Sequence, residues 1–200
     1  YTSFDAYYRD VDTNTVELRF VSSDQWRLFN DTTSWVIGTR VKNNKEDLLR
    51  QYTYADGDFV SQYQPITQAV YGQLESQLSN DLLLTFALRA ENYDFSYGDN
   101  AGLNGEHDST MLGGKLALSY QLGQQLVYAS VSRGYKGAGI NPDQNVSTDN
   151  RFYDEEYNWN YEIGMKGRLA DQLTSRVAFF VMKREDTQVS DYELQYRDDG

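Results

Sequence analysis

The chain has 200 residues, no cysteine and a formal net charge of −12, with 30 acidic against 18 basic residues. The acidic balance argues against nucleic acid as a partner, because binding to phosphates requires clustered lysine and arginine. The missing cysteines exclude a disulfide framework and a cysteine-based metal site.

Alternation of apolar and polar residues marks the strands expected in the first third of the chain. Val16, Leu18 and Phe20 alternate with Glu17 and Arg19, which predicts a strand with one apolar and one polar face. The predicted strands here cover residues 1–9, 15–23 and 34–42, with a polar loop at 10–14 and a long polar connection at 43–65 that has room for a short strand at 48–54.

The middle of the chain carries the most regular alternation, and we predict strands at 67–78, 82–93, 111–122 and 126–135. The last two are joined by three turn residues, which is typical of a tight antiparallel hairpin. Each arm has about 10–12 residues, as a tilted strand needs to cross a bilayer, whereas globular strands have roughly five or six. Residues 97–109 are rich in Gly, Asn and Asp, which predicts a loop.

The last third continues the same pattern after a second long polar loop at 136–158. Strands are predicted at 159–169 and 173–184, and one more could begin within 188–197. In the strand at 173–184 the run Phe179, Phe180, Val181 and Met182 blurs the alternation.

Short turns and long polar loops alternate strictly along the chain. The short turns centre near Asp31, Asn80, Gln124 and Asp171 and recur roughly every 45 residues. A propeller can have this repeat length, but its blades hold four short strands, whereas two long strands fill each repeat here. Outer-membrane barrels have short periplasmic turns and long external loops. The predicted fold class is therefore all-β, an antiparallel up-and-down transmembrane β-barrel.

Five runs of sequence resemble strands of one family, the TonB-dependent outer-membrane receptors. They are V-E-L-R-F-V-S-S at 16–23, Y-G-Q-L at 71–74, L-R-A-E at 88–91, Y-A-S-V-S-R-G-Y-K-G-A-G-I-N at 128–141 and Y-E-I-G-M-K-G-R-L-A-D-Q-L at 161–173. The runs occur in the order that the family has them.

The resemblance implies a Gram-negative outer-membrane barrel of about 22 strands around a plug domain. Residues 1–200 would form part of that one barrel domain, about 8–10 strands, with the plug and the barrel termini absent from this chain. The implied function is TonB-energised uptake of a scarce nutrient, most often an iron chelate such as a ferric siderophore. The implied partners are the lipid bilayer, the nutrient, and the TonB complex acting through the plug. A passive outer-membrane pore and a soluble all-β carbohydrate-binding module are the alternatives.

Arg133, Tyr135 and Lys136 are candidate ligand contacts. They end a predicted strand on the long-loop side, where a ligand would arrive, and cations next to an aromatic ring suit an anionic chelate. Residues at a membrane interface have the same composition, so an interfacial role is the alternative.

No catalytic, metal or cofactor site is predicted. The single histidine, His107, has Glu106, Asp108 and Asp99 near it in sequence, but without the ligand spacing of a zinc or calcium motif. The glycines that follow Arg133 precede no helix, so they predict a turning chain rather than a phosphate cradle. One loop histidine does not make a credible Ser-His-Asp set, so we expect no enzyme.

Overall fold

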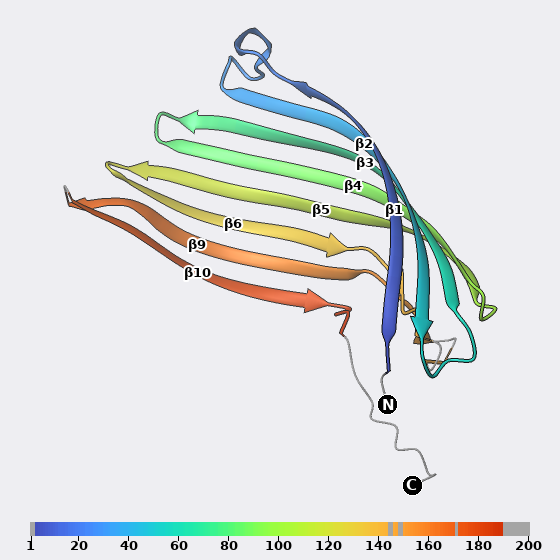
Figure 1. Cartoon of the computed structure of the whole chain (residues 1–200). Coiled ribbons are helices and arrows are strands. Elements are labelled where there is room, and N and C mark those ends of the chain that lie inside the picture. Colours follow the sequence, from blue (N-terminus) through green and yellow to red (C-terminus); the bar gives the residue numbers. More distant parts are fainter. Residues whose placement is uncertain (1–2, 144–145, 148–149, 171, 190–200) are drawn as a thin grey trace.

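The computed structural model describes residues 3–143, 146–147, 150–170 and 172–189. Across these residues the main element is an eight-stranded antiparallel sheet in the order β1-β2-β3-β4-β5-β6-β9-β10 (Figure 1). Its strands are β1 (Asp5–Val21), β2 (Thr33–Tyr52), β3 (Phe59–Ser79), β4 (Leu82–Asp99), β5 (Asn104–Leu122), β6 (Gln125–Lys136), β9 (Glu156–Ala170) and β10 (Leu173–Glu185). The described residues include no helix with the length and apolar character that crossing a bilayer would require.

The predicted alternation of short and long connections holds only in part. The connections after β1, β3 and β5 lie at one end of the strands, which we call the short-turn end, and those after β2, β4 and β6 lie at the other, the long-loop end (Figure 1). The connection after β1 (22–32) is nevertheless longer than those after β2 (53–58) and β4 (100–103), because strand pairing takes up most of the predicted long loops. The turns near Asn80 and Gln124 join β3 to β4 and β5 to β6. The connection after β1 holds a 3-10 turn, η1 (Asp24–Trp26), and the left-handed residues Phe29, Asn30 and Asp31, with φ of 53°, 56° and 64°. The turn predicted near Asp171 is centred outside the described residues.

Most strands are longer than predicted, with 12 to 21 residues in the main sheet. The predicted loop at 10–14 lies inside β1, residues 43–52 extend β2, and most of 97–109 belongs to β4 and β5. These segments are polar because both of their faces meet water or polar neighbours, and they still pair: Asp12 stands opposite Lys45 in the β1–β2 ladder. Polarity alone was therefore the wrong criterion for a loop. Of the strand considered at 188–197, residues 188–189 are not in a strand and the rest lie outside the described residues.

Strand pairing gathers the alternating residues into two continuous faces. One row across four strand pairs reads Leu18, Thr39, Val70, Ala90 and Leu112. The apolar side chains of this face are largely exposed, including Val70 at 59% and Leu112 at 57%. We call it the apolar face. In β10 it holds Val177, Phe179 and Val181, which resolves the blurred alternation there and leaves Phe180 and Met182 on the opposite face.

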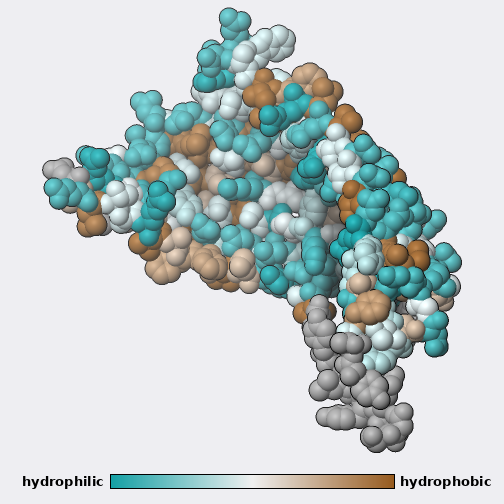
Figure 2. All heavy atoms as spheres, viewed as in Figure 1, coloured by the Kyte–Doolittle hydropathy of each residue, from teal (hydrophilic) through white to brown (hydrophobic). Residues whose placement is uncertain are grey.

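The opposite face is polar and lies on the concave side of the curved sheet. Its side chains reach across intervening strands, because Tyr71 of β3 bonds to Glu17 of β1 and Tyr135 of β6 bonds to Arg89 of β4. The curvature of the sheet brings side chains on its hollow side closer together, which favours such contacts across an intervening strand. Figure 2 shows hydrophilic side chains around that hollow. We call this the inner face.

The described parts of the connection between β6 and β9 (137–143, 146–147 and 150–155) include segments that fold back onto the inner face at the long-loop end. They contain two short strands, β7 (Gly139–Ile140) and β8 (Phe152–Tyr153), which pair with each other. Ala138 and Phe152 pack against Phe95 and Tyr97 of β4. This contact forms the main buried cluster of the described chain.

Candidate functional site

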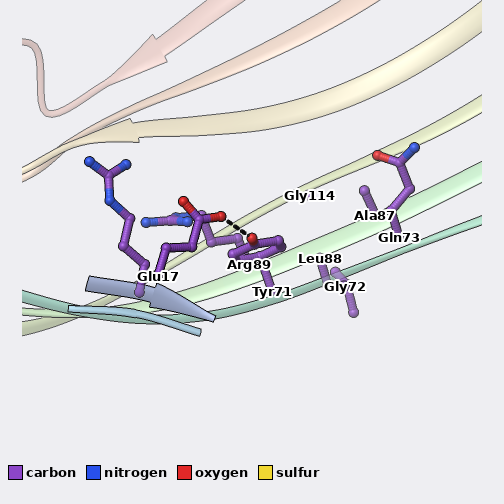
Figure 3. A pocket seen from close by; sticks show the side chains of 9 residues that line it. Glu17, Tyr71, Gly72, Gln73, Ala87, Leu88, Arg89 and Gly114 are labelled. Carbon is purple, nitrogen blue, oxygen red and sulfur yellow. Dashed lines mark hydrogen bonds between the residues drawn. The ribbon is translucent and has the colours of Figure 1, made fainter. Parts of the chain in front are cut away.

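A network of charged and tyrosine side chains spans the inner face from β1 to β6. The Tyr71 hydroxyl donates a hydrogen bond to the Glu17 carboxylate (Figure 3). Arg89 Nε lies 2.9 Å from Glu91 Oε2 and 3.0 Å from the Tyr135 hydroxyl oxygen. The Arg89 guanidinium carbon is 5.8 Å from the centroid of the Tyr71 ring, within cation–π range. The network ties four strands together on the side that would face a barrel lumen.

Tyrosine rings on the inner face cover glycines of the neighbouring strand. The Tyr71 ring lies over Gly38 so closely that any side chain there would overlap it. The Tyr128 ring covers Gly164 in the same way, with its Cζ 2.6 Å from where a Cβ would stand, and its hydroxyl donates to Glu162 Oε1 at 2.5 Å. Because glycine has no side chain, the tyrosine ring can lie flat along the wall at these positions. The tyrosine hydroxyl then reaches a glutamate carboxylate.

The long-loop end holds an aromatic cluster on the inner face, which we call the outer-end cluster. Its buried members are Phe95, Tyr97 and Ala138, exposed at 3%, 6% and 4%. Partly buried neighbours surround them: Tyr63, Tyr93, Leu103, Ile140 and Phe152. The cluster fixes the β6–β9 connection against the wall, so this end of the inner face is covered by protein.

A buried ion pair fastens the same connection. Arg151 Nη2 lies 2.8 Å from Asp99 Oδ2, and the two side chains are 5% and 0% exposed. Arg151 also donates to the carbonyl oxygens of Asn141 and Pro142. Burial alone would raise the pKa of the Asp99 carboxyl, but hydrogen bonds from Arg151, the Leu103 amide and the Tyr97 hydroxyl outweigh it and lower the pKa below its ordinary value.

The possible metal ligands around His107 are separated by strand alternation. His107 stands opposite Phe95 on the inner face, whereas Glu106 and Asp108 point to the other side of β5. The His107 ring stacks on Phe95 with centroids 5.5 Å apart, and its Nε2 lies 3.2 Å from Glu155 Oε1. Within the described residues, no group of His, Cys, Asp and Glu is arranged to hold a metal ion.

The three candidate ligand contacts occupy different environments. The Arg133 guanidinium lies over the Tyr157 ring, 3.9 Å from its centroid, and donates to the Leu112 carbonyl. Tyr135 belongs to the inner-face network through Arg89 and Glu91. Lys136 is exposed at the end of β6. Arg133 and Tyr135 therefore already have structural partners, and Lys136 is the most accessible of the three.

Two features of the site were not predicted from sequence. Arg151 sits in a polar stretch, and nothing local indicates that it reaches back to Asp99, 52 residues earlier. The tyrosine–glycine pairs could have been found by placing the strands in register, since Gly38 stands directly opposite Tyr71.

Comparison with known proteins places this wall in a family. The model of the TonB-dependent receptor-like β-barrel matches residues 1–200. The chain belongs to this family. Its members are β-barrels of the Gram-negative outer membrane. In barrels of this kind an apolar band on the outside meets lipid and the interior is polar.

Solved structures show the same fold at low sequence identity. The ferric yersiniabactin uptake receptor FyuA from Yersinia pestis is similar with a TM-score of 0.78 and 22% identity, over 94% of this chain and 30% of FyuA. The alcaligin outer-membrane receptor FauA from Bordetella pertussis has a TM-score of 0.66 and 16% identity, over 91% of this chain and 30% of FauA. The ferripyoverdine receptor of Pseudomonas aeruginosa has a TM-score of 0.68 and 17% identity, over 89% of this chain and 26% of that receptor.

The receptor barrel described here spans about 30% of the length of FyuA. No curated protein matches the chain significantly.

Proposed function

We propose that this chain is part of the wall of a TonB-energised receptor that imports a scarce nutrient, a ferric siderophore. The observation that carries the proposal is the family match over the whole chain, together with an inner face that is polar and partly covered at the long-loop end. A wall of this kind binds and guides a solute and needs no catalytic group, so we propose no enzymatic role.

The nature of the nutrient is inferred from the similar structures. FyuA takes up ferric yersiniabactin, FauA is named for alcaligin, and the Pseudomonas aeruginosa receptor binds ferripyoverdine. Shared fold supports an iron chelate as the class of ligand for this chain. The copper transporter OprC has a related fold, with a TM-score of 0.64, so a different metal ion is the competing choice.

The remaining partners follow from the same proposal. A plug domain elsewhere in the full-length protein would occupy the lumen and contact TonB. Arg133, Tyr135 and Lys136 are proposed as contacts for an arriving anionic ligand. The strand register places Arg133 beside Gly114, in the row of the apolar face, so Arg133 would meet the ligand only at the rim of the barrel. Because Lys136 is exposed at the end of β6 and the other two already have partners, Lys136→Gln is the cleanest test of that part.

The function can be tested by uptake in the organism that encodes the full-length protein. Cells carrying or lacking its gene would be given ⁵⁵Fe loaded on a catecholate, a hydroxamate or a carboxylate siderophore, or radioactive copper. We expect one ferric chelate to be taken up only when the gene is present, and a protonophore to abolish that uptake.

Other outcomes would overturn the proposal. Uptake that persists in the presence of the protonophore would indicate a passive pore. If the gene is required for uptake of copper but of no iron chelate, the proposed nutrient is wrong and copper takes its place. If Lys136→Gln leaves both uptake and ligand affinity unchanged, Lys136 is not a contact, and the barrel assignment is unaffected.

A further inference from the structure

The apolar face carries a groove near the short-turn end of β2 to β5, on the opposite side of the wall from the network in Figure 3. Apolar side chains from these strands and from the turn before β2 line it, among them Leu28, Trp35, Ile37, Leu74, Phe86 and Leu112. Four of them, Leu28, Ile37, Phe86 and Leu112, are 39–57% exposed, so no part of the described protein fills the groove.

Gly72 leaves a gap in the apolar row that lines the groove, whereas the Leu88 side chain covers Gly114 further along the same row. Ile37, Gly72, Leu88 and Gly114 stand side by side on four successive strands. At Gly72 the nearest atom to a built Cβ is the Val36 carbonyl oxygen at 3.4 Å, an ordinary contact, so nothing crowds the space above this glycine. A side chain can therefore begin at this position without displacing the backbone.

The groove opens at the short-turn end, which is the periplasmic side in barrels of this kind. Trp35 lines it and donates from Nε1 to the Trp26 carbonyl oxygen at 2.8 Å. Trp26 and Phe29 are 70% and 72% exposed, as is typical of aromatic residues at a membrane–water interface. The opening thus lies at the headgroup level of the periplasmic leaflet.

An ion pair stands beside the opening. Arg27, next to Leu28 in sequence, lies 2.8 Å from Asp24, and both side chains are accessible to solvent. The pair offers a cation to a phosphate and an anion to an ammonium group, which complements a zwitterionic headgroup better than a purely anionic one.

We propose that this groove binds one acyl chain of a zwitterionic phospholipid from the periplasmic leaflet, with the headgroup at Arg27 and Asp24. The proposal follows from the family's membrane location and does not depend on which nutrient the receptor imports. The groove is continuous with the lipid-facing surface, and its opening selects the periplasmic leaflet over the lipid A of the external leaflet.

Native mass spectrometry of the full-length receptor tests this directly. The receptor would be stripped with detergent, titrated with phosphatidylethanolamine, and compared with Gly72→Leu, which fills the groove. The matched control is Ala129→Leu, which adds three carbons where Gly72→Leu adds four, to the apolar face between Leu118 and Ile163, away from the groove. We expect Gly72→Leu to weaken binding about tenfold, the effect of losing contact with one or two methylene groups, and Ala129→Leu to leave it unchanged.

Arg27→Glu provides a second test that leaves the sheet intact, since Arg27 lies on an exposed turn. We expect it to weaken phosphatidylethanolamine binding several-fold as well. The proposal is overturned if the wild-type receptor binds no phosphatidylethanolamine tightly, if Gly72→Leu and Arg27→Glu both bind as the wild type does, or if the retained lipid is lipid A. Dimerisation that is lost in Gly72→Leu would also overturn it, by making a second copy the occupant.

Discussion

The membrane-spanning part of the sheet and its long-loop end share one alternation but bury their apolar side chains in different ways. In the spanning part no described residue covers the apolar face, and Leu88 is 56% exposed. At the long-loop end Phe95, on the inner face, is only 3% exposed because the β6–β9 connection covers it. We expect lipid to stabilise the first region from outside, whereas a folded connection covers the second from inside.

A sequence pattern gives the two faces of a strand but not what covers each face. In water an exposed apolar face of this extent would be an aggregation site. In the bilayer it is the favourable surface, and the backbone is satisfied by the ladder between strands. The two regions should therefore respond to different substitutions.

The largest expected effect is the loss of the Asp99–Arg151 pair. Asp99→Ala leaves the Arg151 guanidinium buried without its carboxylate, and breaking a buried pair in this way costs about 3–5 kcal/mol. Hydrogen exchange should show lost protection at Tyr97 and in the β6–β9 connection, with the spanning strands unchanged. Asp24→Ala, which removes a carboxylate paired on the surface with Arg27, is the matched control and should change little. Unchanged protection in Asp99→Ala would show that the pair does not hold the connection.

A charge on the apolar face should have the next largest effect. Leu116→Arg places a cation against hydrocarbon and is expected to lower the free energy of unfolding in vesicles by about 2–4 kcal/mol. Ala117→Arg, one residue along, points to the inner face between Thr85 and Ser130 and should have a much smaller effect. Equal losses for the two variants would contradict the assignment of the faces.

The two faces were predictable from the sequence and the covering of the inner face was not. The alternation of Leu116 and Leu118 with Ala117 depends only on the geometry of a strand, and so it was read correctly. Sequence patterns underestimate the length of the strands, because polar segments such as 10–14 still form backbone hydrogen bonds with the neighbouring strand. The outer-end cluster depends on contacts between Asp99 and Arg151 and between Phe95 and Phe152, which no local pattern encodes.

Acid should release the outer-end connection while leaving the spanning strands intact. Burial alone would raise the pKa of the Glu155 carboxyl, but its hydrogen bonds, including the one with His107, lower it below the ordinary 4.5, and the pKa of Asp99 is likewise below 3.8. Carboxyls with a lowered pKa stabilise the folded state above their ordinary values and lose that contribution as the pH falls through the folded pKa. Hydrogen exchange at Ala138 should be slow above about pH 5 and accelerate, relative to the intrinsic rate, below about pH 4. A pH-independent protection would contradict a role for these carboxyls.

The smallest effect is expected for Tyr71→Phe. It removes the hydrogen bond to Glu17 but keeps the ring over Gly38, so the thermal midpoint should change by little more than the error of the measurement. Tyr71→Ala also uncovers the glycine and should be clearly more destabilising. If Phe and Ala were equally destabilising, the hydroxyl and not the ring would be the important part.

The most direct test of the central claim is a nitroxide scan of residues 83–90 of β4 in the full-length receptor in bilayers. Accessibility to oxygen and to a water-soluble nickel complex would be measured by electron paramagnetic resonance at each position. We predict that oxygen accessibility alternates with a period of two along the strand. Leu84, Phe86 and Leu88 should be accessible to oxygen and shielded from nickel, whereas Thr85 and Ala87 should be shielded from the oxygen dissolved in the membrane. Absence of that alternation, or its reversal, would contradict the placement of the apolar face against lipid.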